Sequence, residues 1–399
     1  MLRWQGFKFE MRLNGKQLRE LRRFAGACRF VYNKALALNN ERYVKKEKRL
    51  GYAALSALLP TWKQEYSWLS EAPAQALQQS LKDLEQAYAN FFQKRAGFPA
   101  LHKKGQNDSF RIPQDFEVDN ENGRVKLPKC EWIRYRKSRD IEGKPKKITV
   151  TVRNEKAFVS IQTEREVDQP VHASTSVLGL DWGVKRFYTL STGEYKESLS
   201  PLKVFLPKLK KSQRRLSYKR KFSKNWQKAK TRVAKLHTKI ANFRKDFIHK
   251  VTNDLSKNHA VIFFEDLQVS NLSKSAKGTT ANQGKKNVKA KSSLNRSILD
   301  ASPHEMRRQL EYKMQWRGGL AIAVPPQNTS RRCPKCGHVS RENRKTQARF
   351  HCVSCGFSSN ADWVGAVNIK EAGLALLACS QSSPEVRASW QEPTEGIHA

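Results

Sequence analysis

The sequence predicts an α+β protein of several domains, in which a helical unit interrupts a small β-barrel and an α/β domain with a cysteine-rich module follows. Three observations support this class. At 399 residues the chain exceeds one ordinary domain. Apolar residues recur at helical spacing in residues 14–95, between short runs that alternate like strands. From about residue 176, buried-strand patterns alternate with helical ones, which indicates an α/β domain.

The first part of the chain contains both the predicted barrel and the helical unit. Residues 2–13 alternate and predict a strand, and ITVTV and AFVSIQ flank a polar turn and predict a hairpin. We assign the barrel to residues 1–13 and 123–175, and the helical unit with a basic loop to residues 14–122. Two apolar stripes predict its main helices, the second starting beside Pro73: Leu18, Leu21, Ala25, Cys28, Tyr32 and Ala35, then Leu77, Leu81, Leu84, Tyr88 and Phe91.

The α/β domain is predicted over residues 176–325. VLGLD, AVIFFED and LAIAV read as buried strands, and residues 201–257 read as a basic helical hairpin. Residues 270–297 are rich in Ser, Gly and Lys and predict a mobile loop. The cysteine-rich module occupies residues 326–358. A last helix of the α/β domain follows at 359–376, and residues 377–399 are expected to be a disordered tail.

The charge of the chain implies a polyanionic partner. It contains 76 Lys and Arg against 36 Asp and Glu, a formal net charge of +40. Such charge repels itself in a compact fold, and nucleic acid is the natural partner because each neutralised phosphate releases counterions. No apolar run approaches the length of a membrane-spanning helix, and the N-terminus lacks the apolar core of a signal peptide. We therefore expect a cytoplasmic, nucleoid-associated protein.

Four of the seven cysteines form two matched pairs, Cys333 with Cys336 and Cys352 with Cys355. Each pair can form a tight knuckle, and two knuckles supply the four thiolates that structural Zn²⁺ prefers. A glycine follows the second cysteine of each pair, where the backbone must turn sharply. His351 is a possible fifth ligand or a surface histidine. A closed four-thiolate site performs no chemistry, so we expect one structural zinc.

Acidic side chains follow two predicted strands and lie near the start of the final helix. Asp181 ends VLGLD, Glu265 ends VIFF, and Asp362 lies in NADWVGAVNI. Groups at strand ends gather at one edge of an α/β sheet, and converging carboxylates can hold two Mg²⁺ ions for phosphodiester hydrolysis.

Each of these acids also has a purely structural explanation. Asp181 can be a turn residue. Glu265 or its neighbour Asp266 can cap a helix or pair with a lysine. Asp362 can be a helix N-cap. The residues alone leave both interpretations open.

The order of the motifs resembles the TnpB (OrfB) family of RNA-guided nucleases, which insertion sequences encode and which are relatives of type V CRISPR effectors. The resemblance rests on GLDWGVKRFYTLSTGE, VIFFEDLQVSNL, CPKCG, CVSCG and NADWVGAVNI, and extends to about residue 370. It implies an RNase H-like (RuvC) nuclease domain with a zinc ribbon, a WED-like barrel and a REC-like helical unit. It makes Asp181, Glu265 and Asp362 the catalytic metal ligands and the four paired cysteines the zinc ligands.

The same resemblance implies a monomeric ribonucleoprotein in which a guide RNA pairs with double-stranded target DNA beside a short flanking motif. The residues that fall where the family reads this motif are Tyr52, Ser56, Gln78 and Lys82, although plain helix surface explains them equally well. Candidate contacts with nucleic-acid backbones, or alternatively a solvated helix face, are Lys208, Lys210, Lys211, Arg214, Arg215, Lys219 and Arg220.

Three other functions compete with an RNA-guided endonuclease. A nuclease-inactive relative would bind DNA and repress transcription, but should lack one of the three acids. A transposase proper, which joins DNA strands, would use similar metal chemistry. A passive RNA-binding protein would leave the acids unexplained.

Overall fold

The computed structural model describes residues 1–106, 108–153, 155–274 and 288–381. Its contacts divide the chain into two compact units, Met1–Asp168 and Gln169–Ala399. Each unit is described below by itself. Among the described helices, none is long and apolar enough to cross a membrane.

The first unit contains a curled antiparallel sheet of seven strands in the order β2-β6-β7-β1-β5-β4-β3. β1 gives it its curl, because Leu2–Glu10 pair with β7 whereas Met11 and Arg12 pair with β5. The strands are β1 (Leu2–Arg12), β2 (Ser109–Ile112), β3 (Glu117–Asp119), β4 (Arg124–Lys126), β5 (Ile133–Tyr135), β6 (Lys144–Arg153) and β7 (Lys156–Glu166). The predicted first strand and the hairpin, now β6 and β7, are confirmed.

One boundary of this unit differs from the prediction. We placed residues 14–122 in the helical unit and its loop, but β2 and β3 lie within that range and belong to the sheet. In β2 the side chains of Phe110 and Ile112 are buried. The two strands are only four and three residues long, too short for an alternating pattern to stand out among polar neighbours.

The helices of the first unit share one core with its sheet. Buried side chains from both, such as Phe7, Leu21 and Leu77, form a single cluster. Both predicted stripes are buried faces of real helices, α1 and α4, and α4 begins directly after Pro73. The helices are α1 (Gly15–Val44), α2 (Tyr52–Ala57), α3 (Leu59–Glu65), η1 (Ser67–Glu71) and α4 (Ala74–Phe92).

The second unit is built on a five-stranded sheet in the order β10-β9-β8-β11-β12. β8, β11 and β12 are parallel, whereas β8, β9 and β10 form an antiparallel meander. The strands are β8 (Val177–Trp182), β9 (Arg186–Leu190), β10 (Tyr195–Glu197), β11 (Val261–Glu265) and β12 (Leu320–Val324). Leu180 of β8 is in register with Phe264 of β11, so the two strands end side by side.

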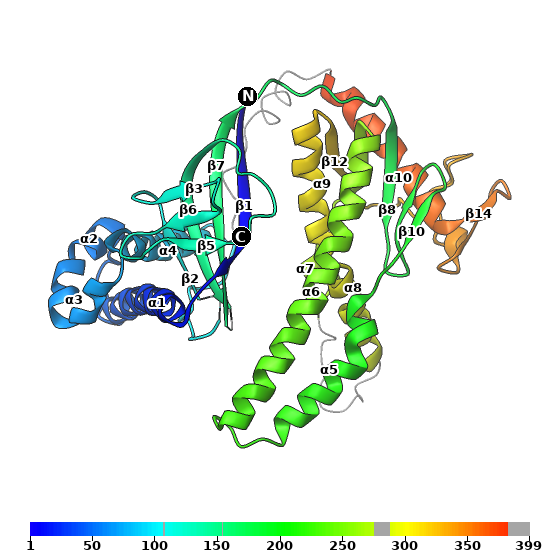
Figure 1. The fold of residues 1–399 in the computed structure, drawn as a ribbon. Helices are drawn as coiled ribbons and strands as arrows, with labels where there is room; N and C mark the ends of the chain where they lie inside the picture. The colour runs from blue at the N-terminus through cyan, green and yellow to red at the C-terminus, as the bar shows by residue number, and fades with distance from the viewer. Residues whose placement is uncertain (107, 154, 275–287, 382–399) are drawn as a thin grey trace. The chain divides into compact units, whose positions relative to one another are not determined.

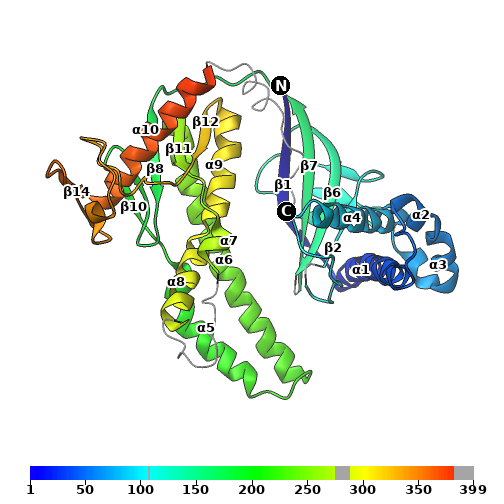
Figure 2. The ribbon, with the colours of Figure 1, turned by 180° about the vertical axis from the view of Figure 1, so that it is seen from behind.

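Helices cover both faces of this sheet (Figures 1 and 2). Leu180 and Phe264 pack with side chains of α6 and α9 on one face, whereas Phe263 packs with Ile369 of α10 on the other. This division follows from the alternation of side chains along a strand. The helices are α5 (Pro201–Ser217), α6 (Lys224–Asn258), α7 (Val269–Leu272), α8 (Val288–Ala301), α9 (Pro303–Arg317) and α10 (Ala361–Gln381).

Two segments of this unit differ from their predictions. In the predicted loop 270–297, residues 288–297 form the first part of α8, and 275–287 lie outside the described residues. The many Lys and Ser residues of this segment obscured its helical pattern. The buried side chains of α8 are Ile298, Asp300 and Ala301, all near its end. The last helix, predicted to end at residue 376, continues to Gln381, so only 382–399 of the predicted tail lie outside the described residues.

The cysteine-rich module packs on the first turns of α10. It contains the short helix η2 (Arg341–Arg344) and the paired strands β13 (Arg349–His351) and β14 (Ser358–Asn360). Phe350 and Cys352 of the module form a buried cluster with Ala361 and Val364 of α10. The module is therefore anchored where the helix that carries Asp362 begins.

Candidate active site and metal centre

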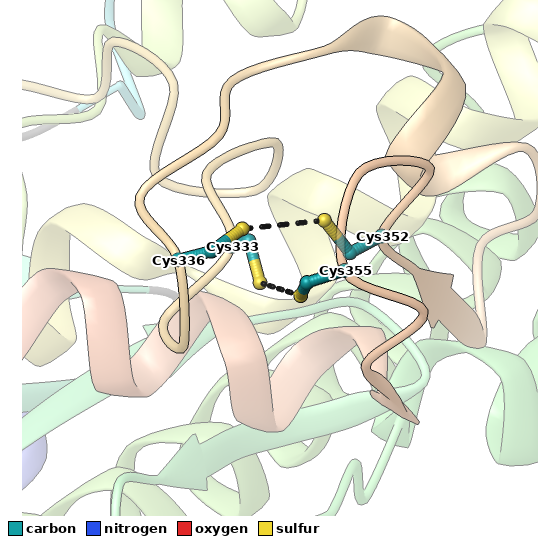
Figure 3. Close-up of side chains that lie close together, drawn as sticks. All are labelled: Cys333, Cys336, Cys352 and Cys355. Atoms are coloured by element: carbon teal, nitrogen blue, oxygen red, sulfur yellow. Dashed lines mark hydrogen bonds between the residues drawn. The ribbon is translucent and has the colours of Figure 1, made fainter.

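The four paired cysteines converge on one point (Figure 3). Their sulfur atoms all lie within 4.8 Å of one another. Cys333 Sγ is 3.7 Å from Cys355 Sγ, and Cys336 Sγ is 3.6 Å from Cys352 Sγ. A tetrahedral zinc site with Zn–S bonds of about 2.3 Å requires sulfurs about 3.8 Å apart. The donor set therefore fits Zn²⁺, and His351 is exposed and not needed to complete it.

The backbone of each knuckle prepares it to hold a metal ion. Gly337 and Gly356 have φ of 74° and 72°, and their N–H groups donate to the carbonyls of Cys333 and Cys352. Burial alone would raise the pKa of Cys352. The N–H groups of the following knuckle residues and the neighbouring sulfurs outweigh that effect and lower this pKa to about 6. A thiol that readily becomes a thiolate suits metal binding.

The three predicted acids lie at one edge of the sheet of the second unit. Asp181 is near the end of β8, Glu265 ends β11, and Asp362 is in the first turn of α10. The side chain of Asp181 packs against Gly365 of α10, where an added Cβ would lie 2.9 Å from Asp181 Oδ2. Glycine at this position lets α10 approach β8 closely enough to bring Asp362 beside Asp181.

The charges of these acids act on one another. Burial raises the pKa of Asp181 well above its ordinary value, and the charges of Glu265 and Asp362 raise it further, while Arg344 opposes them. Burial also raises the pKa of Glu265, against a hydrogen bond from Thr329 and the charge of Arg344. A cation bound beside Asp181 would offset both the burial of its charge and the repulsion from Glu265 and Asp362.

Contacts in the structure argue against two of the structural explanations for these acids. Asn360, not Asp362, caps α10, since its Oδ1 accepts from the N–H groups of Asp362 and Trp363 at 3.0 and 3.2 Å. Asp266 forms an ion pair with Arg307, whereas Glu265 accepts from the Thr329 hydroxyl. Glu265 is therefore part of the acidic cluster, whereas Asp266 links the end of β11 to Arg307 of α9.

Sequence reasoning missed two residues that contact the acids. Arg344 ends η2 of the cysteine-rich module, and its Nη2 lies 3.2 Å from Asp362 Oδ1. Thr329 is buried, and Asn368 of α10 holds it by donating to its carbonyl at 2.7 Å. Neither stands out by local sequence pattern, because the contacts of both depend on how the segments before and within the module pack beside the acids.

The acids are spaced more widely than the cysteines. Among the described residues, the cysteine set is the group of possible metal ligands whose donor atoms all lie within 4.8 Å of one another. A single small cation held by all three acids would require similar proximity. The three acids therefore do not form, in the part of the chain that the structure describes, a ligand set as tight as that of the cysteines.

The predicted nucleic-acid contacts fall on accessible surface. Tyr52 and Ser56 lie on α2, and Gln78 and Lys82 lie on α4. Lys82 is exposed and the other three are half-buried, and Lys82 Nζ lies 5.2 Å from the Tyr52 ring centroid. The seven predicted backbone contacts on α5 and the turn after it are all exposed, and the structure shows none of these described side chains in an ion pair: Lys208, Lys210, Lys211, Arg214, Arg215, Lys219 and Arg220.

Three family models match the chain. The OrfB model of IS605-type elements, described as "Probable transposase", matches residues 160–276, and "Cas12f1-like, TNB domain" matches residues 304–369. A "Helix-turn-helix domain" model of the same OrfB group matches residues 1–48. In the structure this last range contains β1 and the single helix α1, so two helices joined by a turn are not present there.

Full-length relatives are also similar to the chain. "Putative RNA-guided DNA endonuclease InsQ" of Escherichia coli K12 is 53% identical over 401 residues, covering 100% of both chains. "Putative RNA-guided DNA endonuclease" of Streptomyces pristinaespiralis is 33% identical over 96% of this chain and 93% of its own. The fold resembles that in a Cas12f1–sgRNA–target DNA complex, with a TM-score of 0.52 and 16% identity over 90% of this chain and 83% of that one.

Proposed function

The chain belongs to the TnpB (OrfB) family of nucleases encoded by insertion sequences, and we propose that it is an RNA-guided, metal-dependent endonuclease that cuts double-stranded DNA beside a short flanking motif. The observation that carries the proposal is the acidic cluster at the ends of β8 and β11. Half-buried Asp181, with the charges of Glu265 and Asp362 acting on it, costs the fold stability in the absence of a cation, whereas hydrolysis of a phosphodiester uses such a group of acids.

Asp181, Glu265 and Asp362 are the proposed ligands for two Mg²⁺ ions, because carboxylate oxygens suit this cation. Burial raises the pKa of Asp181 most and the charges of Glu265 and Asp362 raise it further, so a cation beside this group would stabilise it. When bound, such ions supply an activated water and stabilise the leaving oxygen. Thr329 fixes the orientation of Glu265 through its hydroxyl. Arg344 offers a guanidinium at the same edge, where a phosphate oxygen can replace its contact with Asp362.

The cysteine module serves this site indirectly. We assign one structural Zn²⁺ to Cys333, Cys336, Cys352 and Cys355, whose spacing matches a tetrahedral thiolate set. The folded module holds η2 in place, and η2 carries Arg344. Loss of zinc should therefore affect cleavage through the position of an arginine as well as through stability.

The remaining assignments extend the same proposal. We infer that the sheet of the second unit is an RNase H-like (RuvC) nuclease core, which its three-stranded meander followed by two parallel strands supports. We infer that the curled sheet and helices of the first unit are the WED-like and REC-like parts. Tyr52, Ser56, Gln78 and Lys82 are proposed to read the flanking motif, since glutamine can read adenine in the major groove.

A guide RNA explains the charge of the chain. The net charge of +40 and the exposed basic side chains of α5 fit a partner with many phosphates, as an RNA together with its paired DNA provides. Base pairing with the guide would supply the long sequence readout, while the protein contacts the backbones.

The proposal can be tested by purifying the chain from cells that also carry its element, sequencing the RNA that copurifies, and adding Mg²⁺ and plasmids with randomised flanks. We expect one discrete RNA and cleavage of matched plasmids beside a single motif. Matched DNA that is bound but left intact would favour an RNA-guided repressor. An absence of bound RNA would refute guidance by RNA, and joined DNA products would indicate a transposase.

A further inference from the structure

The turn between α5 and α6, residues 218–223, lies far from the core of the second unit. α6 has no buried residue before Ile240, and its main core contacts begin at Ile248. At 1.5 Å per helical residue, the turn is about 40 Å from Ile248. Figures 1 and 2 both show this hairpin extending away from β8 and β11. The turn therefore contributes little to the packing of the unit.

Exposed aromatic side chains nevertheless gather at this turn. Tyr218 is 74% exposed and Phe222 is 79% exposed. Phe222 contacts Trp226, with ring centroids 5.6 Å apart. Its backbone has φ of 67°, the left-handed region where Asn or Gly is more usual. The fold gains little from a phenylalanine that is both strained and exposed, which points to a role outside folding.

Cations surround these rings. The Arg214 guanidinium lies 6.0 Å from the Tyr218 ring, and Lys230 Nζ lies 5.1 Å from the Trp226 ring. Residues 201–245 contain 17 Lys and Arg and not one Asp or Glu. Toward the base of the hairpin Arg244 pairs with Asp300 and Lys250 with Asp246, whereas among the described residues no ion pair is found for Arg214, Lys219, Arg220, Lys221 or Lys230 near the turn. Aromatic rings within a field of unneutralised cations form a surface that fits single-stranded nucleic acid.

We propose that Tyr218, Phe222 and Trp226, which we call the aromatic tip, stack on unpaired bases of the guide RNA. Lys219, Arg220 and Lys221 lie between the first two rings in sequence and are exposed, so they can hold the phosphates beside those bases. This inference rests on the proposed function, and it identifies unpaired bases of the guide RNA as the part that the aromatic tip binds.

RNA fits the aromatic tip better than target DNA does, for two reasons. The DNA strand being cut must reach Asp181, whereas the tip lies about 40 Å along α6 from the core contacts near the sheet. A folded guide also has loops and bulges whose splayed bases aromatic rings can stack upon, which paired DNA does not offer.

The first test measures affinity for the RNA that copurifies with the chain. Phe222→Asn suits a left-handed backbone, so the fold should be preserved or slightly stabilised. Combined with Tyr218→Ala, it should weaken RNA binding about 5- to 150-fold per base released from stacking. The slope of log Kd against log salt should not change, because no cation is removed. Phe222→Trp retains a ring and should retain affinity.

A matched control is Val204→Asn, which removes an exposed apolar side chain of the same hairpin, 68% exposed, away from the turn. It should leave RNA affinity unchanged. Equal loss in this control, or unchanged affinity in the double variant with a normal thermal unfolding midpoint, would overturn the aromatic tip while leaving the proposed function intact. Wild-type protein that retains no RNA would overturn both.

A second measurement identifies the nucleic acid at the tip. A photo-reactive phenylalanine analogue at position 222 is incorporated into the ribonucleoprotein, which is irradiated with and without matched plasmid DNA. We expect crosslinks to unpaired nucleotides of the RNA in both samples. Crosslinks to DNA alone, or to paired RNA alone, would contradict the inference.

Discussion

Replacing Gly365 by Ala is expected to displace a catalytic carboxylate without removing any charged group. The new Cβ would lie 2.9 Å from Oδ2 and 3.3 Å from Cγ of Asp181. Ordinary contacts of this kind are 3.4 Å or longer, so the carboxylate must move by about half an ångström or rotate. Asp181 is half-buried and its side chain packs against Gly365 of α10, which leaves the carboxylate little room to do so.

The effect on stability and the effect on catalysis should separate. Alanine is favoured over glycine in a helix by about 1 kcal/mol, which offsets part of the strain. The free energy of unfolding should therefore stay within about 1–2 kcal/mol of wild type. A misplacement of about 1 Å can reduce catalysis about 100-fold, so for a shift of about half that size we expect roughly a 10-fold loss in cleavage of matched plasmid.

The assay compares single-turnover cleavage over a range of Mg²⁺ concentrations with urea unfolding and RNA retention. Gly26→Ala is the matched control. It makes the same change within α1, where the nearest atom to a new Cβ is 3.8 Å away, on an arginine side chain. Cleavage by Gly365→Ala within threefold of wild type would refute the idea that α10 fixes the position of Asp181.

Three further predictions concern the same region. Without added Mg²⁺, Asp181→Asn should be more stable than wild type at pH 7–8, because the raised pKa of Asp181 makes its ionised form unfavourable in the folded state. The difference in free energy of unfolding should shrink as the pH falls and Asp181 gains a proton. Urea unfolding across pH measures this difference, and a variant less stable than wild type at pH 7–8 would contradict the prediction. We expect elemental analysis to find one zinc per chain in the wild type and none in Cys352→Ser, which should also lose cleavage. Full activity of a zinc-free protein would contradict a structural role. Arg344→Gln should reduce cleavage about 10- to 1,000-fold and leave RNA retention unchanged. Unchanged cleavage would mean that Arg344 does not contact the phosphate and serves only in its ion pair with Asp362.

The sequence predicted the elements that depend on local pattern. The strands that carry Asp181 and Glu265 are short apolar runs, and acids that follow such runs are visible without a structure. The cysteine set was predictable because the spacing within each pair determines a knuckle. The basic helical hairpin was predictable because apolar residues of what is now α6 recur at helical spacing from Trp226 to Leu255.

Other features depend on how the elements pack. The ion pair between Arg344 and Asp362 exists because Phe350 and Cys352 pack on the start of α10, which no local pattern reveals. The role of Gly365 becomes visible only when α10 lies on β8. α8 was missed because its inward face is narrow and its Lys and Ser residues resemble those of a loop.

The most direct test of the central claim compares two neighbouring acids. Glu265→Gln removes a proposed metal ligand. Asp266→Asn changes the adjacent residue and removes its ion pair with Arg307. Both ribonucleoproteins are incubated with matched plasmid and Mg²⁺, and cleavage and DNA retention are measured together. We predict that Glu265→Gln binds matched DNA but does not cut it, and that Asp266→Asn cuts at nearly the wild-type rate. Cleavage by Glu265→Gln, or equal loss in both variants, would contradict a catalytic centre built from Asp181, Glu265 and Asp362.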